Sequence, residues 1–260
     1  MIDKNCLSYW FPKLLQSGVL VPKTVIVETE CDLYAFNDGE TPVKFDEFLA
    51  EINRAATNFT LPLFLRTGHT SGKHDWRNTC FIEDVAQFPE NICSLIEYSS
   101  LVDFIGLPLR IWVLREFLEL DVLETLPRFN GMPLAKEFRA FVEDGEIKSI
   151  HPYWPKGAIE QGLGFNQFYV ENYAGILADA LTAINPVDQE VAGHMLKSVA
   201  ETFKGDGAWG VDICRAKNGN WYVTDMAIAE QSFHWPECPR LEPQVLVMPD
   251  FEAMLEDVPA

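Results

Sequence analysis

Basic residues are scarce in this chain. Its 20 lysines and arginines stand against 39 aspartates and glutamates, which gives a formal net charge of −19 at pH 7. This balance argues against general binding to nucleic acid or to anionic membranes, because both carry negative charge themselves. It is compatible with a small nucleotide, which requires only a local basic pocket. Apolar runs long enough to span a membrane are also missing, so we expect no membrane-spanning helix.

Paired cysteine motifs and a Walker A motif are absent as well. The six cysteines include no C-x-x-C pair, and no signal peptide is recognisable, so we expect reduced thiols and a cytoplasmic protein. The sequence contains no G-x-x-x-x-G-K-[ST], which excludes a phosphate site of the P-loop type. With 260 residues, 48% of them hydrophobic, the chain is long enough for one large domain or two closely packed lobes.

What the chain does contain is a hairpin pattern towards its C-terminal end. The dipeptide Asn218-Gly219 suits a two-residue type I′ turn between two apolar strands. Counting back from that turn places Asp212 opposite Asp225 on one face. Two opposed like charges destabilise a sheet, and a bound cation would remove that cost. A slipped register or two solvated aspartates are the alternatives, but the neighbouring residues are too apolar for an exposed hairpin: Trp209, Val211, Ile213, Trp221 and Val223.

A second pattern is a basic loop that follows an apolar strand. Residues 61–65 predict a buried strand, and residues 66–77 combine cations with glycines: Arg66, Gly68, Gly72, Lys73 and Arg77. Glycine lets a backbone approach a ligand closely, and backbone N–H groups together with cations form an anion-binding hollow. We favour phosphate binding here over a solvated polar turn. Zinc binding is a weaker alternative, because no second pair of ligands supports the set His69, His74 and Cys80.

A second hairpin is predicted between residues 135 and 153, with its turn at Asp144 and Gly145. On its first strand, Glu137 and Arg139 share one face. An arginine on a mostly apolar strand is costly to bury unless it is paired. Two interpretations are equally supported: a structural ion pair between Glu137 and Arg139, or an arginine that binds phosphate.

The remaining periodicities predict further elements. Strands are expected over residues 24–28, 31–36, 80–83 and 109–118. Helices are expected within residues 1–21, 45–59, 88–106, 168–185, 186–204 and 250–257. Residues 119–133 are expected to form an irregular loop.

The order of four segments resembles the ATP-grasp superfamily. These are the strand with its basic loop, the strand that ends in Arg-Glu-Phe-Leu, the hairpin EFRAFVEDGEI, and the hairpin with two aspartates. Within the superfamily, the chain looks most like phage and bacterial ATP-grasp proteins of unassigned substrate. It looks more distantly like the eukaryotic cell-division-cycle factors that assist assembly of a translation initiation factor. The resemblance covers residues 24–235. It implies an α+β fold whose two lobes of antiparallel sheet hold ATP between them.

The resemblance also implies a division of the chain into three parts. Residues 1–60 would form a lead-in and a small α/β subdomain. Residues 61–118 would form the lobe with the flexible phosphate loop. Residues 119–260 would form the lobe with the metal-binding hairpin.

Roles for single residues follow from the same resemblance. Arg66 before the loop and Lys73 within it would bind phosphate. Arg139, or Lys136 if the register differs, would face the phosphates from the second lobe, and Asp212 with Asp225 would hold Mg²⁺. Arg66, Lys73 and Arg139 are then the residues that would neutralise charge during catalysis. The strand that links the lobes would present an acidic residue and backbone groups to adenine, and it corresponds to Arg115, Glu116, Phe117 and Leu118.

One departure concerns the metal-binding hairpin. The family usually has an asparagine two positions after the second acidic residue, and here that position is Ala227. Glu230 or a water molecule would have to replace the missing ligand. Because Mg²⁺ keeps several waters, two aspartates and the phosphates of ATP suffice to hold it.

Three functions follow from the resemblance. The first is an ATP-dependent ligase that joins an unknown carboxylate to an amine, or to a related nucleophile, through an acyl-phosphate. His74 and His234 are the candidates for a general base in such a reaction. The second is a non-catalytic, ATP-binding assembly factor or chaperone for a protein partner. The third, a protein that joins or modifies nucleic-acid ends, conflicts with the acidic balance of the chain.

Overall fold

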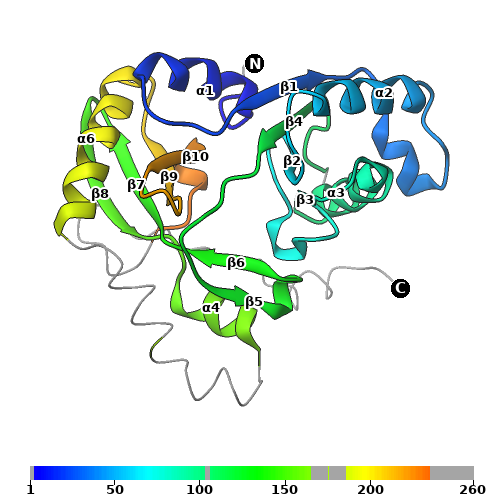
Figure 1. Cartoon of the computed structure of the whole chain (residues 1–260). Coiled ribbons are helices and arrows are strands. Elements are labelled where there is room, and N and C mark those ends of the chain that lie inside the picture. The colour runs from blue at the N-terminus through cyan, green and yellow to red at the C-terminus, as the bar shows by residue number, and fades with distance from the viewer. Residues whose placement is uncertain (1–2, 103–105, 165–174, 176–185, 235–260) are drawn as a thin grey trace, which may run out of the picture.

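The computed structural model describes residues 3–102, 106–164, 175 and 186–234. In this part of the chain, two four-stranded antiparallel sheets are each covered by helices, and a two-stranded sheet lies below them (Figure 1). The predicted α+β class with antiparallel sheets is confirmed. None of the helices in these residues is both long enough and apolar enough to cross a membrane. The helices predicted over residues 168–185 and 250–257 lie outside the described residues.

The first lobe is built on a sheet with the order β1-β4-β2-β3. Its strands and covering helices are β1 (Thr24–Glu28), β2 (Leu63–Thr67), β3 (Phe81–Ile82), β4 (Ile111–Glu116), α2 (Phe45–Ala56) and α3 (Phe88–Val102). Side chains alternate across a strand, and on β2 and β4 one set packs against the helices: Leu63, Leu65, Trp112 and Leu114. The alternate positions, which include Arg66 and Arg115, therefore point away from these helices.

The second lobe is built on a sheet with the order β10-β9-β7-β8. Its elements are β7 (Glu137–Glu143), β8 (Glu146–Pro152), β9 (Trp209–Arg215), β10 (Trp221–Ile228), α6 (Pro186–Thr202) and α1 (Leu7–Leu14). The expected N-terminal helix is present as α1, and Gly18 in the left-handed conformation follows its last turn. Although α1 begins the chain, its residues Trp10 and Phe11 pack into the core of this C-terminal sheet.

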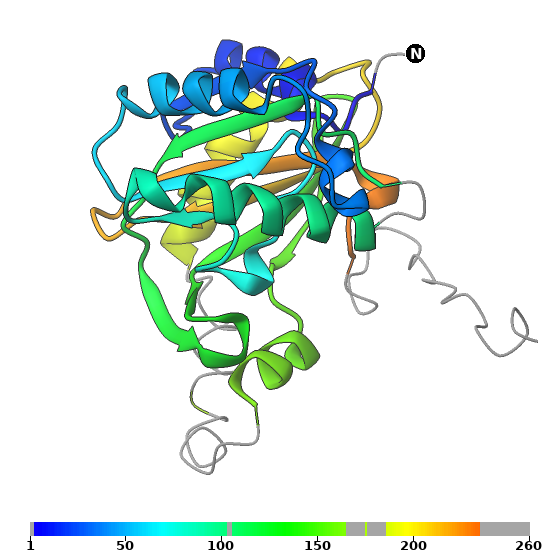
Figure 2. The same ribbon diagram turned by 90° about the vertical axis from the view of Figure 1, so that its right-hand side faces the viewer.

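A smaller unit projects below both lobes (Figure 2). It consists of β5 (Val122–Leu126), β6 (Met132–Ala135) and α4 (Lys156–Leu163). The prediction of an irregular loop over residues 119–133 is therefore wrong. These strands are too short to give a clear local signal, and they bury their apolar side chains only against distant residues such as Trp76 and Ile159.

The strand predicted over residues 31–36 is also wrong. The structure places the 3₁₀ helix η2 (Leu33–Asp38) there. Its backbone hydrogen bonds are local, from Ala35 N–H to the Asp32 carbonyl and from Gly39 N–H to the Phe36 carbonyl. Such turns satisfy the backbone without a partner strand.

The packing units cross the boundary predicted at residues 60 and 61. The first sheet joins β1, from the predicted N-terminal part, to β2, β3 and β4 from the predicted central lobe. Helix α1 belongs by its contacts to the second lobe. The division into three consecutive segments therefore does not follow the sheets, because strands pair across that boundary.

Candidate functional site

A cleft of about 780 Å³, partly open to solvent, lies between the two lobes and the two-stranded sheet. Its apolar lining consists of Pro22, Phe64, Trp76, Phe117, Leu118, Leu120, Met132, Pro133 and Trp154. Its charged lining consists of Arg66, Lys73, Arg115, Glu116, Glu137, Asp212 and Asp225. Pockets for small ligands typically have this size and this mixture of apolar walls with a few polar groups.

The hairpin of β9 and β10 places two carboxylates in this cleft. The prediction that Asp212 lies opposite Asp225 is confirmed, but the predicted two-residue turn is wrong. Gly219 has a φ of +85°, and its N–H bonds to the Ala216 carbonyl at 2.9 Å. The loop is therefore three residues long, a common form in which the last residue is left-handed.

A β-bulge at Thr224 restores the register that the longer loop shifts. Trp221 pairs with Arg215, and Asp225 pairs with Asp212, so the shift occurs between Val223 and Asp225. A bulge places two consecutive side chains on one side of a strand. Thr224 and Asp225 consequently both line the cleft, while Val223 and Met226 on either side remain in the core.

Asp212 is held by a neighbouring arginine rather than by solvent. Arg139 on β7 donates from Nε to Oδ1 at 2.7 Å and from Nη2 to Oδ2 at 2.8 Å. Both side chains are largely buried, so this bidentate pair is well shielded. The ion-pair interpretation of Arg139 named the wrong partner, because its carboxylate is Asp212 and not Glu137.

Two predicted phosphate ligands of the second lobe stay outside the cleft lining. Arg139 is turned to Asp212, and its guanidinium also lies 4.6 Å from the ring centre of Tyr153. Lys136 forms an ion pair with Asp121 at 3.5 Å. Neither side chain is among the residues that line the cleft.

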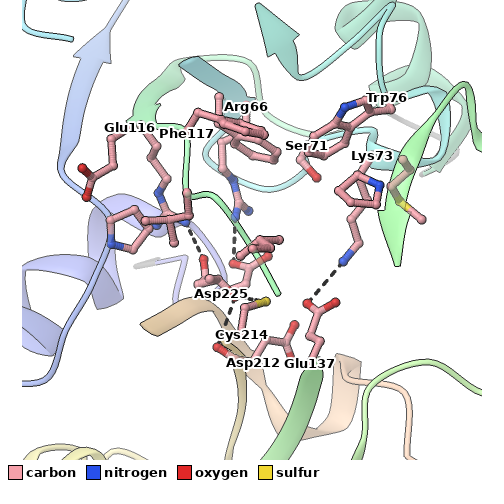
Figure 3. A pocket seen from close by; sticks show the side chains of 18 of the residues that line it. Arg66, Ser71, Lys73, Trp76, Glu116, Phe117, Glu137, Asp212, Cys214 and Asp225 are labelled. Atoms are coloured by element: carbon pink, nitrogen blue, oxygen red, sulfur yellow. Dashed lines mark hydrogen bonds and ion pairs between the residues drawn. The ribbon is translucent and has the colours of Figure 1, made fainter. Parts of the chain in front are cut away.

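Arg66 reaches across the cleft to the second lobe. Its Nη1 lies 2.9 Å from Asp225 Oδ1, and its Nε donates to the Thr67 carbonyl at 3.1 Å; Figure 3 shows this cross-lobe pair. Burial alone would raise the pKa of Asp225, but the charges of Arg66 and Arg115 outweigh it, so the pKa lies below its ordinary value. Asp225 is therefore ionised at neutral pH.

Lys73 makes the second contact between the lobes. Its Nζ lies 3.6 Å from Glu137 Oε1 and stands over the rings of Tyr153 and Trp154, at 4.0 Å and 4.8 Å from their centres. Burial lowers the pKa of Lys73, but the charge of Glu137 and the other acidic groups raise it more, and the net shift is upward. Lys73 is thus a charged group held in an aromatic and acidic setting.

Glu137 is the cleft residue that sequence reasoning missed. Trp154 Nε1 donates to its Oε2 at 2.9 Å, and its side chain points towards Lys73 (Figure 3). The available signal was its position on one strand face with Arg139. That signal became informative only once β7 paired with β9, which sets Glu137 opposite Cys214 and Arg139 opposite Asp212.

The loop after β2 is ordered by its own hydrogen bonds. Thr79 Oγ1 donates to the carbonyls of Gly72 and Asp75 at 2.9 Å and 2.8 Å. A side chain at Gly68 would meet Cys6 Sγ at 2.6 Å, so this glycine permits packing against the N-terminal segment. Of the loop, Ser71, Lys73 and Trp76 line the cleft.

The weaker zinc alternative finds no support in the described residues. His69 Nε2 lies 2.6 Å from Asp3 Oδ2, and the His74 ring stacks on Phe129 with ring centres 4.6 Å apart. The Cys80 thiol contacts the Trp76 carbonyl at 3.7 Å. No group of three or more potential metal ligands occurs among the residues searched.

The segment that leaves β4 forms the apolar wall. Phe117 lies edge-on to Phe81 and Trp76, with ring centres 5.1 Å and 6.3 Å apart. Glu116 accepts a hydrogen bond from Lys23 N–H at 2.6 Å, and its carboxylate points away from the other labelled side chains (Figure 3). The backbone of this segment, rather than the Glu116 carboxylate, therefore faces the cleft beside the aromatic rings.

The two candidate bases do not line the cleft. His74 is packed on Phe129, and burial together with the charge of Lys73 lowers its pKa. His234 lies against Phe141, with ring centres 4.6 Å apart. Glu230, considered as a replacement for the missing asparagine, is exposed on η6 (Ala229–Gln231) and is not part of the cleft lining either.

Comparison with known proteins gives a family match. A family model described as an ATP-grasp domain, the third family of its clade, matches residues 53–242. The match covers most of the chain and includes every charged residue of the cleft lining. Among curated proteins, none matches the sequence.

Similar solved structures belong to longer proteins. An N5-carboxyaminoimidazole synthetase from Staphylococcus aureus complexed with ADP has 12% identity and a TM-score of 0.47, covering 89% of this chain and 47% of that one. A RimK domain ATP-grasp protein from Sphaerobacter thermophilus has 12% identity and a TM-score of 0.44, covering 86% and 57%. N5-carboxyaminoimidazole ribonucleotide synthetase from Thermotoga maritima has 13% identity and a TM-score of 0.41, covering 89% and 44%. This chain spans about half the length of the structures it matches.

Proposed function

This chain belongs to an ATP-grasp domain family, and on that premise we propose that its cleft binds ATP with the base against the apolar wall and the phosphates at the charged end. The observation that carries the proposal is the composition of one cleft: aromatic rings on one side, and cations from the first lobe on the other. A nucleotide has the same two-part character, a planar base joined to a polyanion.

The base side of the proposal rests on residues 116–118 and the aromatic rings near them. Aromatic rings bind planar bases through stacking and apolar contact. The Phe117 and Trp76 side chains supply such a surface, and the backbone of the segment supplies hydrogen-bonding groups. The phosphate side rests on Arg66 and Lys73, which enter the cleft from β2 and the loop after it.

Magnesium fits the oxygen donors that this cleft offers. Asp212, Asp225 and Glu137 are carboxylates in the lining, and hard oxygen ligands are those that Mg²⁺ prefers. We propose that Asp212 and Asp225 hold Mg²⁺ together with nucleotide phosphates. Bound magnesium supplies shielding of the charge on the phosphate oxygens.

We further propose that the reaction is an ATP-dependent ligation through an acyl-phosphate. A substrate carboxylate oxygen attacks the γ-phosphorus of ATP, and the bond to the β–γ bridging oxygen breaks, which releases ADP. An amine nitrogen then attacks the acyl carbon and expels phosphate, with loss of a proton. Arg66, Lys73 and, through Asp212, Arg139 neutralise charge that develops on the phosphate oxygens, so positioning and electrostatics supply the rate.

Isotope transfer tests this reaction directly. The protein is incubated with ATP, Mg²⁺, an ¹⁸O-labelled pool of carboxylates and an amine. Formation of an acyl-phosphate moves one labelled oxygen from the carboxylate into the released phosphate. Phosphate that carries no ¹⁸O, although ATP is consumed, contradicts the acyl-phosphate step while leaving ATP binding in place.

The second candidate function is ATP binding without ligation, in service of a protein partner. One observation favours it: the position two residues after Asp225 is Ala227, which offers no metal ligand, and no group of three or more potential metal ligands occurs among the residues searched. Retention of intact ATP over hours, in the presence of Mg²⁺ and the substrate pool, supports this function. Release of ADP that depends on a carboxylate and an amine excludes it.

Arg66 provides a prediction for the phosphate side. Arg66→Ala should weaken ATP binding on the order of tenfold to a hundredfold, because a charged hydrogen bond contributes about 1.5–3 kcal/mol. Arg66→Lys should weaken it less, since lysine keeps the charge and loses the planar fork. Calorimetric titration with ATP and with adenosine measures both effects, and adenosine affinity should change little. A lower melting temperature with unchanged ATP affinity would instead make Arg66 a structural strut for Asp225.

The loop after β2 provides a prediction for nucleotide contact. Ser71 and Lys73 line the cleft, so backbone amides between residues 68 and 77 should exchange hydrogen more slowly once ATP and Mg²⁺ are bound. Amides of α2, which contributes no residue to the cleft lining, serve as the internal control. Equal slowing in both segments would indicate a general gain in stability rather than contact with the loop.

A further inference from the structure

Arg115 is a buried cation on the strand that links the lobes. Only 4% of its surface is exposed, yet it lines the cleft. It pairs with Phe64 across β2 and β4, and two positions along the same ladder Arg66 pairs with Val113. Arg66 and Arg115 therefore lie on the same face of the first sheet, on neighbouring strands.

The hydrogen bonds of Arg115 are incomplete. Nη1 donates to the Thr224 carbonyl, and one side of the guanidinium stands over Trp10 and Phe11, 5.8 Å and 5.6 Å from their ring centres. In the part of the chain that the structure describes, Nε and Nη2 have no hydrogen-bond partner. Buried donors of a charged group are rarely left unmatched, because their desolvation is costly.

The two unmatched donors form one edge of the guanidinium. Arg139 uses that same edge, Nε with Nη2, to bind both oxygens of Asp212. The edge suits two oxygens of a carboxylate or phosphate group. Arg115 thus presents, beside the cleft, the fork that Arg139 has already matched.

The local charge balance points the same way. Arg66 and Arg115 lie near one carboxylate, Asp225, and Arg66 forms the ion pair with it. Lys73 and Arg139 have carboxylates of their own, Glu137 and Asp212. Burial, and after it the charge of Arg66, lower the pKa of Arg115 to about 9. An anion at this place would remove the uncompensated charge.

We infer that Arg115 is a phosphate-binding residue, whose Nε and Nη2 donate to two oxygens of the nucleotide's phosphate tail. The inference rests on the proposed ATP site, and it gives Arg115 a role distinct from that of the adjoining residues 116–118 at the base. The competing role is structural: a strut that joins the lobes through the Thr224 carbonyl.

The test compares Arg115→Met with Arg115→Lys and with a matched control, Arg110→Met. Arg110 precedes β4, is exposed, and pairs with Glu28 at 2.8 Å. Calorimetry measures the binding of ATP, ADP and adenosine in the presence of Mg²⁺. Arg115→Met should weaken ATP and ADP on the order of tenfold to a hundredfold and adenosine less than about twofold. Arg115→Lys should fall between the wild type and Arg115→Met, and Arg110→Met should match the wild type.

The melting temperature without ligand separates the two roles. Removal of a buried charge with unmatched donors should leave the melting temperature of Arg115→Met equal to or above that of the wild type. A lower melting temperature with ATP affinity retained overturns the inference in favour of the strut. Parallel losses of ATP and adenosine affinity overturn it in favour of a role at the base.

Titration with inorganic triphosphate keeps the inference separate from the proposed function. If the wild type binds triphosphate but not ATP, the proposed ATP site fails, and loss of triphosphate binding in Arg115→Met still supports the anion site. If the wild type binds ATP and Arg115→Met binds ATP and triphosphate equally well, the inference fails and the ATP site stands.

Discussion

Asp212→Ala is expected to lower the free energy of unfolding by about 3–5 kcal/mol, because breaking a buried ion pair leaves its partner uncompensated. Asp212 holds Arg139 through two hydrogen bonds of 2.7 Å and 2.8 Å, and both side chains are largely shielded from water. Without Asp212, the guanidinium of Arg139 would stay buried beside Tyr153 with its charge unmatched. Urea denaturation followed by circular dichroism measures the change.

The double variant Asp212→Ala/Arg139→Met is the decisive companion. It removes both charges, so most of the lost stability should return, and the two substitutions should be strongly non-additive. The exposed pair of Lys148 with Glu146, at 2.7 Å, is the matched control, since Glu146→Ala should change stability by less than about 1 kcal/mol. A double variant as unstable as the sum of the single variants would contradict the assignment of a tight, buried pair.

Asp225→Asn is expected to change ATP binding in opposite directions with and without magnesium. In the absence of Mg²⁺, Asp225 repels phosphate and occupies Arg66 at 2.9 Å. Loss of its charge should therefore strengthen the binding of metal-free ATP on the order of tenfold. In the presence of Mg²⁺, the same change removes a proposed ligand, and ATP should bind more weakly than to the wild type.

Titrations of ATP in EDTA and in Mg²⁺ measure this reversal. Asp46→Asn, at an exposed position of α2, controls for the loss of one negative charge from an acidic chain. If Asp225→Asn weakens ATP equally under both conditions, Asp225 acts through the fold of the hairpin and not through metal or Arg66. An unchanged affinity under both conditions would place the phosphates elsewhere.

Local patterns in the sequence predicted the strands that carry the site, for a clear physical reason. Alternation of apolar and polar residues on β9 and β10 fixes which side chains face the core, so Asp212 and Asp225 had to share the other face. The same reasoning located Arg66 at the end of a buried strand. The turn was wrong by one residue and the bulge at Thr224 compensated for it, because burial of Val223 and Met226 constrains the register more strongly than the turn residues do.

The partners of the charged residues, by contrast, were decided by tertiary structure. Arg66 meets Asp225 across the two lobes, and Glu137 enters the cleft beside Lys73 because β7 pairs with β9. Short-range periodicity encodes which face of a strand is buried, but not which strand lies next to it. Helix α1 shows the same limit. Its presence was predicted from the sequence, whereas its place against the C-terminal sheet depends on contacts with strands far along the chain, where burial of Trp10 and Phe11 outweighs proximity in sequence.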